Sequence, residues 1–449
     1  MEIIDDLNEF QQQDLHLSMD ESEKVLSFHS KFYKTSYINK LSLPFTIKEI
    51  RTGGSHIVYS INPEDARIQY LSRSYLRQLW PTIRVLPELK NKIRIAWCLN
   101  HATNIVSDCH LKFKEEGSDE KNFTIVPGFD SVYLDFHHQL YRNKSTSETE
   151  KELGNYSKYI EFSDYLPEHV TNAFQPWPYA RHKNDLRNSL PLFLGVEVEH
   201  EYDLKNNIAD LLKMQEYIEK EKEGEGEWRD IECNFKYIEI SGAYCNPKKK
   251  SMLLPPELWG KFLRSTEADL MYMRQFPDIS FYYPILKMVD VEIEEPEENE
   301  ISVLLDTSPY PCDVIMFAAS NNEDLSNYKK DLISYFNITE GQEDEDYTGL
   351  ISDDQFSAEM EGHFPKLPYR KGYVAYSLNW NSNSLDAQSG IVYDEKRNGK
   401  LMIGINNRIL NRETIIQIRL RCTSRLKFTK KEKKDGDSDG EKYRVEFFK

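Results

Sequence analysis

Short stretches in which apolar and polar residues alternate are the feature that most restricts the fold of this chain. Residues 195–202 are the clearest example. Successive side chains of a β-strand point to opposite faces, so strict alternation predicts a strand with one buried and one hydrated face. The buried face is expected to carry Val196, Val198, His200 and Tyr202, and the hydrated face Glu197, Glu199 and Glu201.

The same alternation recurs in two later stretches. Val289, Val291 and Ile293 alternate with acidic residues, and Ile416, Ile418, Leu420 and Cys422 alternate with Gln417, Arg419 and Arg421. Further strands are predicted at residues 56–61, 109–113, 237–240, 401–405 and 443–447. Gly, Pro, Asn and Asp separate these runs, and 12% of the residues are aromatic. Both properties are typical of all-β domains.

Few segments favour a helix. Ile208, Leu211, Leu212 and Ile218 fall on one helical stripe, which predicts a helix over residues 207–222. Residues 257–274 and 322–336 are weaker candidates. Strands and helices do not alternate regularly, which argues against a doubly wound parallel sheet.

The length of 449 residues favours two domains. The charged, glycine-punctuated segment at 219–227 is interpreted as a linker. It divides the chain into an N-terminal segment with a first β domain (residues 1–222) and a second β domain (residues 228–449). Residues 340–354 form a second acidic segment, expected to be a loop at the tip of a sandwich.

Several short segments form a recognisable series when they are taken in order. They are Gly53-Gly54 with residues 57–61 and 66–71, Trp80-Pro81, residues 94–100, 105–113 and 133–136, Gln175-Pro176-Trp177, and residues 190–193, 281–287, 372–378 and 388–390. This series resembles the major capsid proteins of nucleocytoplasmic large DNA viruses, in particular their asfarvirus-like branch. Ala387-Gln388 departs from that family's Gln-Pro, and the typical N-terminal segment is not recognisable.

The resemblance implies an all-β fold of two tandem eight-stranded jelly rolls, a double jelly roll with a few short helices in loops. It further implies a homotrimer that forms a pseudo-hexagonal capsomer and tiles an icosahedral shell. The implied partners are neighbouring capsomers and minor capsid and penton proteins, with an internal membrane contacted only indirectly. The implied location is the virion, with synthesis in the host cytoplasm.

Charge and hydropathy limit other functions. The net charge of −18 disfavours direct binding of nucleic acid, because the chain repels phosphate backbones. No run approaches 18 apolar residues, and residues 1–6 lack the features of a secretion signal. The six scattered cysteines are expected to be reduced thiols, and the four glycosylation sequons at Asn122, Asn143, Asn155 and Asn337 are interpreted as chance matches.

No residue is predicted to be catalytic, cofactor-binding or metal-binding, no cofactor is expected, and the chain is predicted not to be an enzyme. No nucleophile elbow, phosphate loop or His-Glu-x-x-His motif occurs. The row Glu197, Glu199 and Glu201 is interpreted as a wet strand face rather than a glycosidase pair. His137-His138 could act as a pH sensor, but ordinary surface or partly buried histidines are the preferred interpretation. Trp177 and Trp259 could stack on sugars, but packing in a core or an interface is preferred. The densest group of possible metal ligands is Cys98, His101, Cys109, His110, His137 and His138; alternation places Cys109 and His110 on opposite faces, which argues against a shared ion.

Three functions therefore compete. The first is the structural capsid subunit. The second is a minor or scaffolding double jelly-roll protein that builds a lattice during assembly. The third is a β-sandwich glycan-binding protein or hydrolase.

Overall fold

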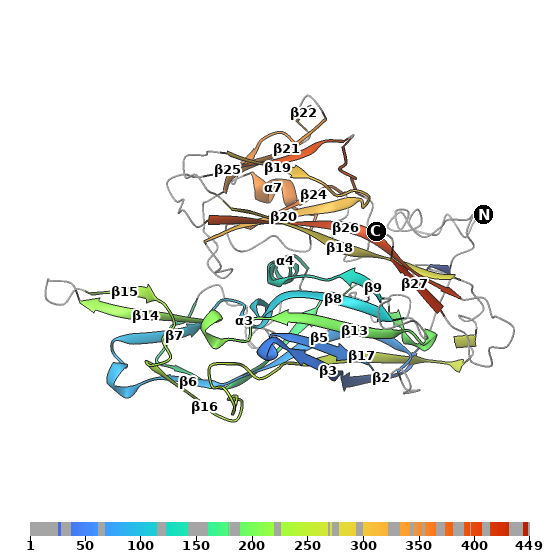
Figure 1. Cartoon of the computed structure of the whole chain (residues 1–449). Helices are drawn as coiled ribbons and strands as arrows, with labels where there is room; N and C mark the ends of the chain where they lie inside the picture. The colour runs from blue at the N-terminus through green and yellow to red at the C-terminus, as the bar shows by residue number, and fades with distance from the viewer. Residues whose placement is uncertain are drawn as a thin grey trace.

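The computed structural model describes residues 26–27, 37–61, 68–114, 123–141, 160–177, 179, 189–219, 226–267, 270–271, 278–292, 300–321, 333–341, 345–346, 348–352, 355–364, 373–379, 390–395, 397–405, 414–430 and 443–447. These residues form two β-sandwiches, one above the other in the view of Figure 1. The pairing of described strands is antiparallel, except for the short parallel pair β1–β18.

The first sandwich consists of two main sheets. One has the strand order β3-β4-β13-β8-β9, and the other has the order β11-β5-β17-β2 with β12 paired to β5. The strands of the first sheet are β3 (Thr46–Arg51), β4 (His56–Ser60), β13 (Glu197–Leu204), β8 (Val106–Lys114) and β9 (Phe123–Pro127). Those of the second are β11 (His169–Gln175), β5 (Tyr70–Trp80), β17 (Glu257–Ser265), β2 (Tyr37–Pro44) and β12 (Leu190–Pro191).

Two small sheets extend the first sandwich at one end. They have the orders β10-β6-β16 and β15-β14-β7, and the β14–β15 hairpin projects away from the body (Figure 1). Their strands are β10 (Tyr165–Leu166), β6 (Thr82–Val85), β16 (Ile238–Ser241), β15 (Gly226–Ile231), β14 (Leu212–Glu219) and β7 (Ile93–Trp97). Short helical turns are η2 (Thr52–Gly54), η3 (Pro87–Leu89), α3 (His101–Asn104), η5 (Leu192–Leu194) and η6 (Ile208–Asp210).

The second sandwich also pairs two sheets, with the orders β1-β18-β26-β20-β24 and β19-β25-β21-β22. The strand β27 joins β26, and β23 joins β21. The strands of the first sheet are β1 (Leu26–Ser27), β18 (Asp278–Glu292), β26 (Thr414–Lys430), β20 (Cys312–Asn321), β24 (Tyr373–Ser377) and β27 (Tyr443–Phe447). The second sheet contains β19 (Glu300–Leu305), β25 (Gly399–Ile405), β21 (Ile333–Glu340), β22 (Glu345–Asp346) and β23 (Ile351–Ser352), and the short helix α7 (Phe356–Met360) follows.

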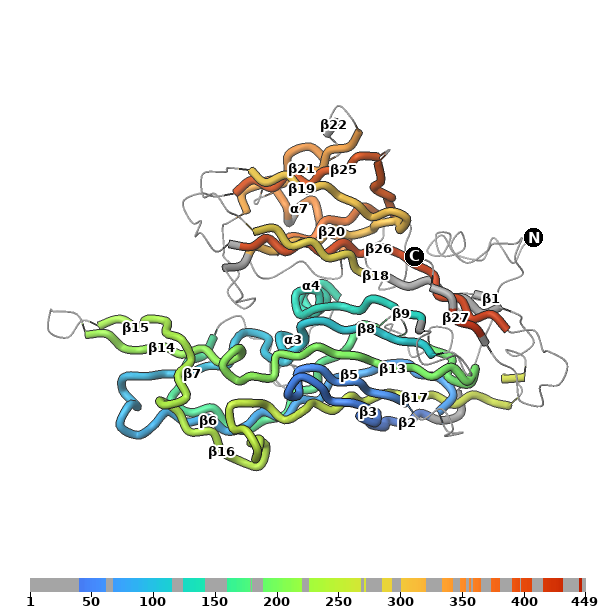
Figure 2. The backbone as a smooth tube through the Cα atoms, in the orientation of Figure 1, coloured from blue at the N-terminus to red at the C-terminus, as the bar shows by residue number. Residues whose placement is uncertain are grey.

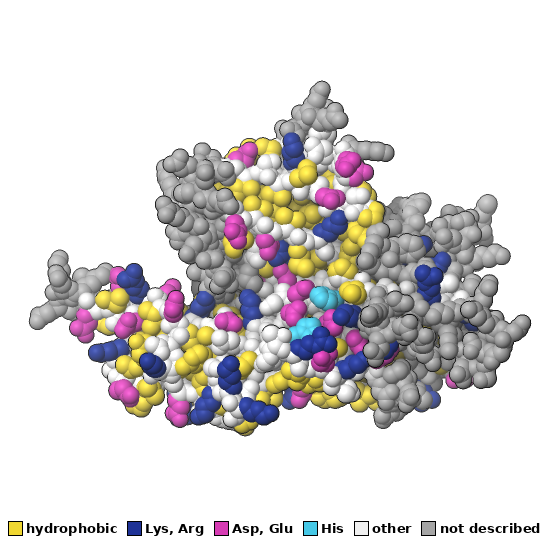
Figure 3. Space-filling model, viewed as in Figure 1, with side chains coloured by type: hydrophobic (Ala, Val, Ile, Leu, Met, Phe, Trp, Pro, Cys, Tyr) yellow, Lys and Arg dark blue, Asp and Glu magenta, His cyan; other side chains and the backbone are white. Residues whose placement is uncertain are grey.

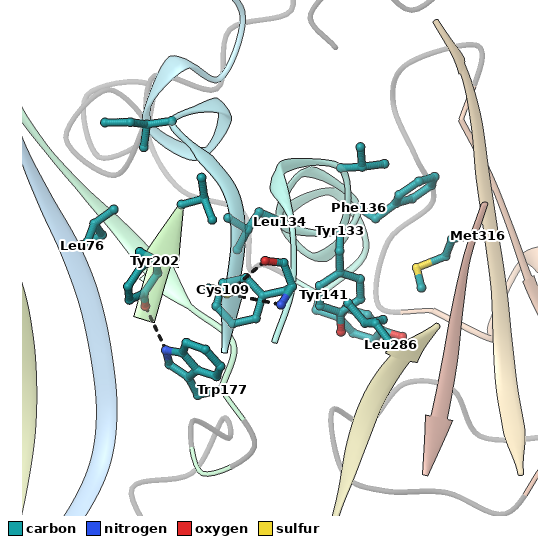
Figure 4. Packing of buried hydrophobic residues seen from close by; sticks show 14 of the residues in the cluster. Leu76, Cys109, Tyr133, Leu134, Phe136, Tyr141, Trp177, Tyr202, Leu286 and Met316 are labelled. Atoms are coloured by element: carbon teal, nitrogen blue, oxygen red, sulfur yellow. Dashed lines mark hydrogen bonds between the residues drawn. The ribbon is translucent and has the colours of Figure 1, made fainter. Parts of the chain in front are cut away.

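One helix, α4 (Ser131–Tyr141), lies between the two sandwiches (Figures 1 and 2). All eleven of its residues are buried. In Figure 4, Leu134 lies on the side of α4 that faces the first sandwich, while Tyr141 approaches Leu286 of the second. Its polar residues Ser131, Asp135 and His138 recur at helical spacing, yet they are buried like its apolar ones, so this polar side faces protein rather than water.

The end of the chain returns to the first sandwich. The rings of Phe428 and Phe113 meet edge to face, with centroids 6.0 Å apart. The hydroxyl of Thr124 in β9 donates a hydrogen bond of 2.9 Å to the backbone oxygen of Val445 in β27. The edge strand β9 is therefore in contact with β27.

Most of the strands predicted by alternation are present. The predictions at 195–202, 109–113 and 401–405 correspond to β13, β8 and β25, and the prediction at 443–447 coincides with β27. The three helix predictions are wrong over most of the residues that the structure describes; only the turn Ile208–Asp210 and residues 267, 270 and 271 are helical. Residues 212–219 form β14, residues 257–265 form β17, and residues 333–336 begin β21; residues 322–332 lie outside the described residues. The expected loop at 340–354 contains β22 and β23, both paired to β21.

The domain boundary expected between residues 222 and 228 needs correction. Glu219 pairs with Gly226 across the β14–β15 hairpin, so these positions belong to one supersecondary unit. The later strands β16 and β17 pair with β6 and β5 of the first sandwich. A charged, glycine-containing run suits a hairpin tip as well as a linker, which is why composition alone misplaced the boundary. We propose that the first domain extends to Ser265 and that the second begins with β18.

Val198→Asp and Ile418→Asp are expected to prevent soluble folding. The two side chains are 2% and 0% exposed, one in each sandwich. An unpaired carboxylate in either interior costs several kcal/mol, comparable with the whole free energy of unfolding. Leu304→Asp is the control, because Leu304 is 60% exposed. The measurement is soluble yield with near-ultraviolet circular dichroism, and wild-type yields of either core variant would contradict the assignment of strand faces.

Candidate functional site: the junction between the sandwiches

Asp130 connects the helix α4 to the second sandwich. One carboxylate oxygen accepts a hydrogen bond of 2.9 Å from the backbone N–H of Tyr133, which caps the first turn of the helix. The other oxygen accepts two hydrogen bonds from the guanidinium of Arg419 in β26, at 3.0 and 2.6 Å. Arg419 is 2% exposed and also donates to Asp290 of β18. A single carboxylate thus fixes both the helix start and the position of β26.

A second buried ion pair lies two residues further along β26. The guanidinium of Arg421 forms a bidentate pair with the carboxylate of Asp313 in β20 and also donates to the hydroxyl of Tyr141 at the end of α4. Both charged side chains are almost fully buried. Burial disfavours the charge of Arg421, but Asp313 together with the hydroxyls of Tyr141 and Tyr133 outweighs it, so the pKa of Arg421 is raised.

Polar and aromatic contacts complete the junction. Asp135 in α4 accepts hydrogen bonds from Asn100 of the first sandwich and from the hydroxyl of Tyr373 in β24. The rings of Phe136 and Tyr373 meet edge to face at 4.9 Å. The helix is therefore bonded to both sandwiches. Such an arrangement can hold two domains at one angle, which makes this junction the candidate functional site.

The sequence pattern missed the junction because it treats every polar strand face as hydrated. Arg419 and Arg421 were expected to alternate outward from the apolar residues of the strand at 416–422. They do so, but α4 covers that face. Two arginines on one face of an otherwise apolar strand were the available signal, since a guanidinium is suited to buried ion pairs.

The acidic row of β13 is less hydrated than expected. Glu199 and Glu201 are only 5% and 8% exposed, so the prediction of a wet face is wrong for these two residues. Glu199 pairs with Lys48, and Glu201 pairs with Lys112 at 2.6 Å. The lysines shield the carboxylates and neutralise them. Figure 3 shows charged side chains of both signs gathered with histidines on this part of the molecule.

The six possible metal ligands are dispersed over several elements. Cys109 is buried in β8 while His110 points to the other face at 31% side-chain exposure, as the alternation predicts. His137 and His138 lie in α4 and are each 7% exposed. Among the described residues, no three His, Cys, Asp or Glu side chains are grouped so as to hold a metal ion. All six cysteines are free.

One histidine of that group has an unforeseen partner. The Nε2 atoms of His101 and His169 are 3.0 Å apart, in an aromatic enclosure with Trp80 and Trp97. His169 Nδ1 lies 3.2 Å from the backbone oxygen of Pro167, so its N–H points there and its Nε2 accepts from His101. Burial and the neighbouring His169 hold the pKa of His101 well below its ordinary value.

The two tryptophans and the sequon residue Asn337 lie in different environments. Trp177 is 2% exposed and donates to the hydroxyl of Tyr202, so it is a core residue. Trp259 lies on the outer face of the sheet that contains β17. The sequon residue Asn337 is 9% exposed within β21, and the asparagines of the other three sequons lie outside the described residues. Within the described part of the chain, no helix has the length and apolar character needed to cross a bilayer.

Comparison with known proteins places the fold. No protein-family model matches this chain, and no curated protein sequence matches it. VP54 of the virus PBCV-1 superposes with a TM-score of 0.59 at 9% identity, over 89% of this chain and 97% of VP54. The Faustovirus major capsid protein superposes with a TM-score of 0.55 at 8% identity, over 88% of this chain and 92% of the Faustovirus protein. A chain of the Sputnik virophage superposes with a TM-score of 0.51 at 11% identity, over 88% of this chain and 87% of the Sputnik chain.

This chain therefore has the double jelly-roll fold of viral capsid proteins, which confirms the fold predicted from the sequence. The resemblance to major capsid proteins of large DNA viruses is confirmed at the level of the fold.

Arg421→Met is expected to destabilise the protein strongly. The substitution leaves Asp313 buried without its guanidinium partner, and breaking a buried pair in this way costs about 3–5 kcal/mol. Arg397→Met is the matched control, because the pair of Arg397 with Glu340 has side-chain exposures of 47% and 16% and is expected to contribute less than about 1 kcal/mol. Urea unfolding measures both. Equal losses in the two variants would show that the junction pair has no special role.

Acid is expected to destabilise the first sandwich through its buried histidines. Burial lowers the pKa of His200 to about 3 and also lowers the pKa of His169. Below pH 6.5 the unfolded chain takes up protons that the folded chain does not, so stability falls as the pH decreases. For His200 the loss is about 1.4 kcal/mol per pH unit down to about pH 3, and His169 adds to the loss in the same direction.

The test measures urea unfolding between pH 7 and pH 4. His200→Gln removes one of the proton-binding groups and should reduce the slope of stability against pH by about one proton. His110→Gln, at a half-exposed position of the same sheet, should retain most of that slope. An unchanged slope in His200→Gln would mean that His200 is not kept neutral by burial.

Proposed function

We propose that this chain is a structural major capsid protein that assembles with copies of itself into an icosahedral viral shell. The observation that carries the proposal is the extent of the structural similarity. It covers 89% of this chain and 97% of VP54, and therefore includes both sandwiches together with their junction. Similarity to a single sandwich would fit many unrelated β proteins, because one fold supports many functions.

The junction supports this proposal physically. A lattice of identical subunits requires each subunit to present the same surfaces at the same angle. Buried ion pairs are costly to form but geometrically demanding, and they can fix one arrangement against its alternatives. A change in the angle between the sandwiches would separate Arg419 from Asp130 and Arg421 from the hydroxyl of Tyr141. The pair Arg421–Asp313 lies within one sheet of the second sandwich and holds the Arg421 guanidinium in position for Tyr141.

The proposed assembly is a homotrimer. Three copies around one axis would place six jelly rolls in a pseudo-hexagonal ring, through a closed heterologous interface. Neighbouring capsomers and minor capsid and penton proteins are the proposed partners, with no direct nucleic-acid contact and only indirect contact with an internal membrane. The proposed location is the virion, after synthesis in the host cytoplasm, and the proposed role is structural rather than catalytic.

Light scattering and negative-stain microscopy of the purified full chain test this function. We expect particles of three subunits with a hexagonal outline. Monomers that bind saccharides would contradict the proposal and favour the glycan-binding or hydrolase alternative. High abundance in purified virions is expected for a major capsid protein, and absence from virions would instead favour the scaffolding role.

A further inference from the structure

The outer face of the sheet β11-β5-β17-β2 carries an aromatic pair. The strand register places Trp259 of β17 opposite Tyr75 of β5 and opposite Pro44 of β2. The rings of Tyr75 and Trp259 are stacked, with centroids 6.3 Å apart and 10° between their planes. Their sequence neighbours Leu76 and Leu258 are buried in the core, so the two rings point away from it and are half-buried.

Basic side chains lie directly beside this pair. Lys261 is opposite Arg73, two residues further along the strands. Lys261 is also opposite Ser42 of β2, two residues from Lys40, so the strand register places Lys40 on the same face. Burial and the positive charges of Lys40 and Arg73 lower the pKa of Lys261. Their proximity is notable in a chain whose net charge is −18.

The aromatic pair is held in place on its other side. Glu257 accepts a hydrogen bond of 2.9 Å from the indole N–H of Trp259 and pairs with Arg77 at 2.9 Å. These contacts fix the rotamer of Trp259 before any partner arrives. A surface that is ordered in advance loses less conformational entropy on binding.

We propose that this aromatic–basic face, formed by Lys40, Arg73, Tyr75, Trp259 and Lys261, docks an acidic surface of a second copy of the chain. The inference rests on the proposed function, because it names the surface through which subunits join. Trp, Tyr and Arg are the side chains that dominate binding energy at protein interfaces.

Charge complementarity favours a second copy as the occupant. Two copies that each carry −18 repel one another at long range, so they associate most favourably where a local positive surface meets an acidic one. The chain supplies such acidic surfaces. On the projecting β14–β15 hairpin (Figure 1), exposed or half-exposed acids are Glu216, Glu219, Glu227 and Asp230. A basic face meeting an acidic surface is a heterologous contact, which can close into a ring of three.

The test compares self-association of the full chain and its variants by sedimentation velocity over a range of protein concentrations. Trp259→Ala and Lys261→Glu should each weaken association by about tenfold or more, and added salt should weaken association of the wild type. Lys249→Glu is the control. It changes the net charge by the same amount as Lys261→Glu, at an exposed loop position outside the aromatic–basic face, and it should associate like the wild type. Circular dichroism establishes that each variant is folded, and Lys261→Glu decides the outcome if Trp259→Ala does not fold.

The outcomes separate this inference from the proposed function. A wild type that associates, together with folded variants that associate equally well, would overturn the inference and leave the capsid proposal intact. A wild type that stays monomeric would overturn both. A heparin oligosaccharide serves as an acidic-glycan probe. Its binding to the wild type but not to Lys261→Glu, with association unchanged, would overturn the inference in favour of a glycan site.

Discussion

The carboxylate of Asp130 is the group on which the arrangement of the molecule depends. One oxygen caps the N-terminus of α4, and the other accepts hydrogen bonds from the guanidinium of Arg419, 289 residues later in the chain. A negative charge at the start of a helix is favourable on its own, because the unpaired N–H groups there are partly positive. The same charge also compensates the burial of Arg419. Local helix capping and the contact between the two sandwiches are therefore one interaction.

Charged residues play two different roles in this structure. At the junction they are buried, bidentate and surrounded by protein, so each pair is geometrically demanding and intolerant of the loss of one partner. On the outer face of the sheet containing β13, lysines lie over Glu199 and Glu201 and remain partly hydrated. These pairs neutralise a row of acids and contribute less to stability than buried pairs do. Composition cannot distinguish the two situations, since both use the same residue types.

Much of the fold could be predicted because the alternation of apolar and polar residues along a strand identifies which of its faces is buried. The pattern around Val198 and Ile418 identified both cores, and the order of the motifs identified the double jelly roll. The failures share a cause. The stripe from Ile208 to Ile218 matched a helix, yet tertiary pairing with β7 and β15 made residues 212–219 a strand. The helix α4 was not predicted, because its polar residues are buried together with its apolar ones and one dry and one hydrated face do not describe it. The role of Arg419 depended on what that helix covers.

The contact between β27 and β9 also bears on the order in which this chain can fold during synthesis. Domains usually fold as they emerge, beginning at the N-terminus. Here the edge strand β9 of the first sandwich contacts β27 through two residues that lie 321 positions apart in the sequence. Until β27 has been synthesised, β9 lacks this contact, and an uncovered edge strand promotes pairing with other chains. On a polysome, where nascent copies stand close together, β9 is therefore exposed to neighbouring copies until β27 has left the ribosome.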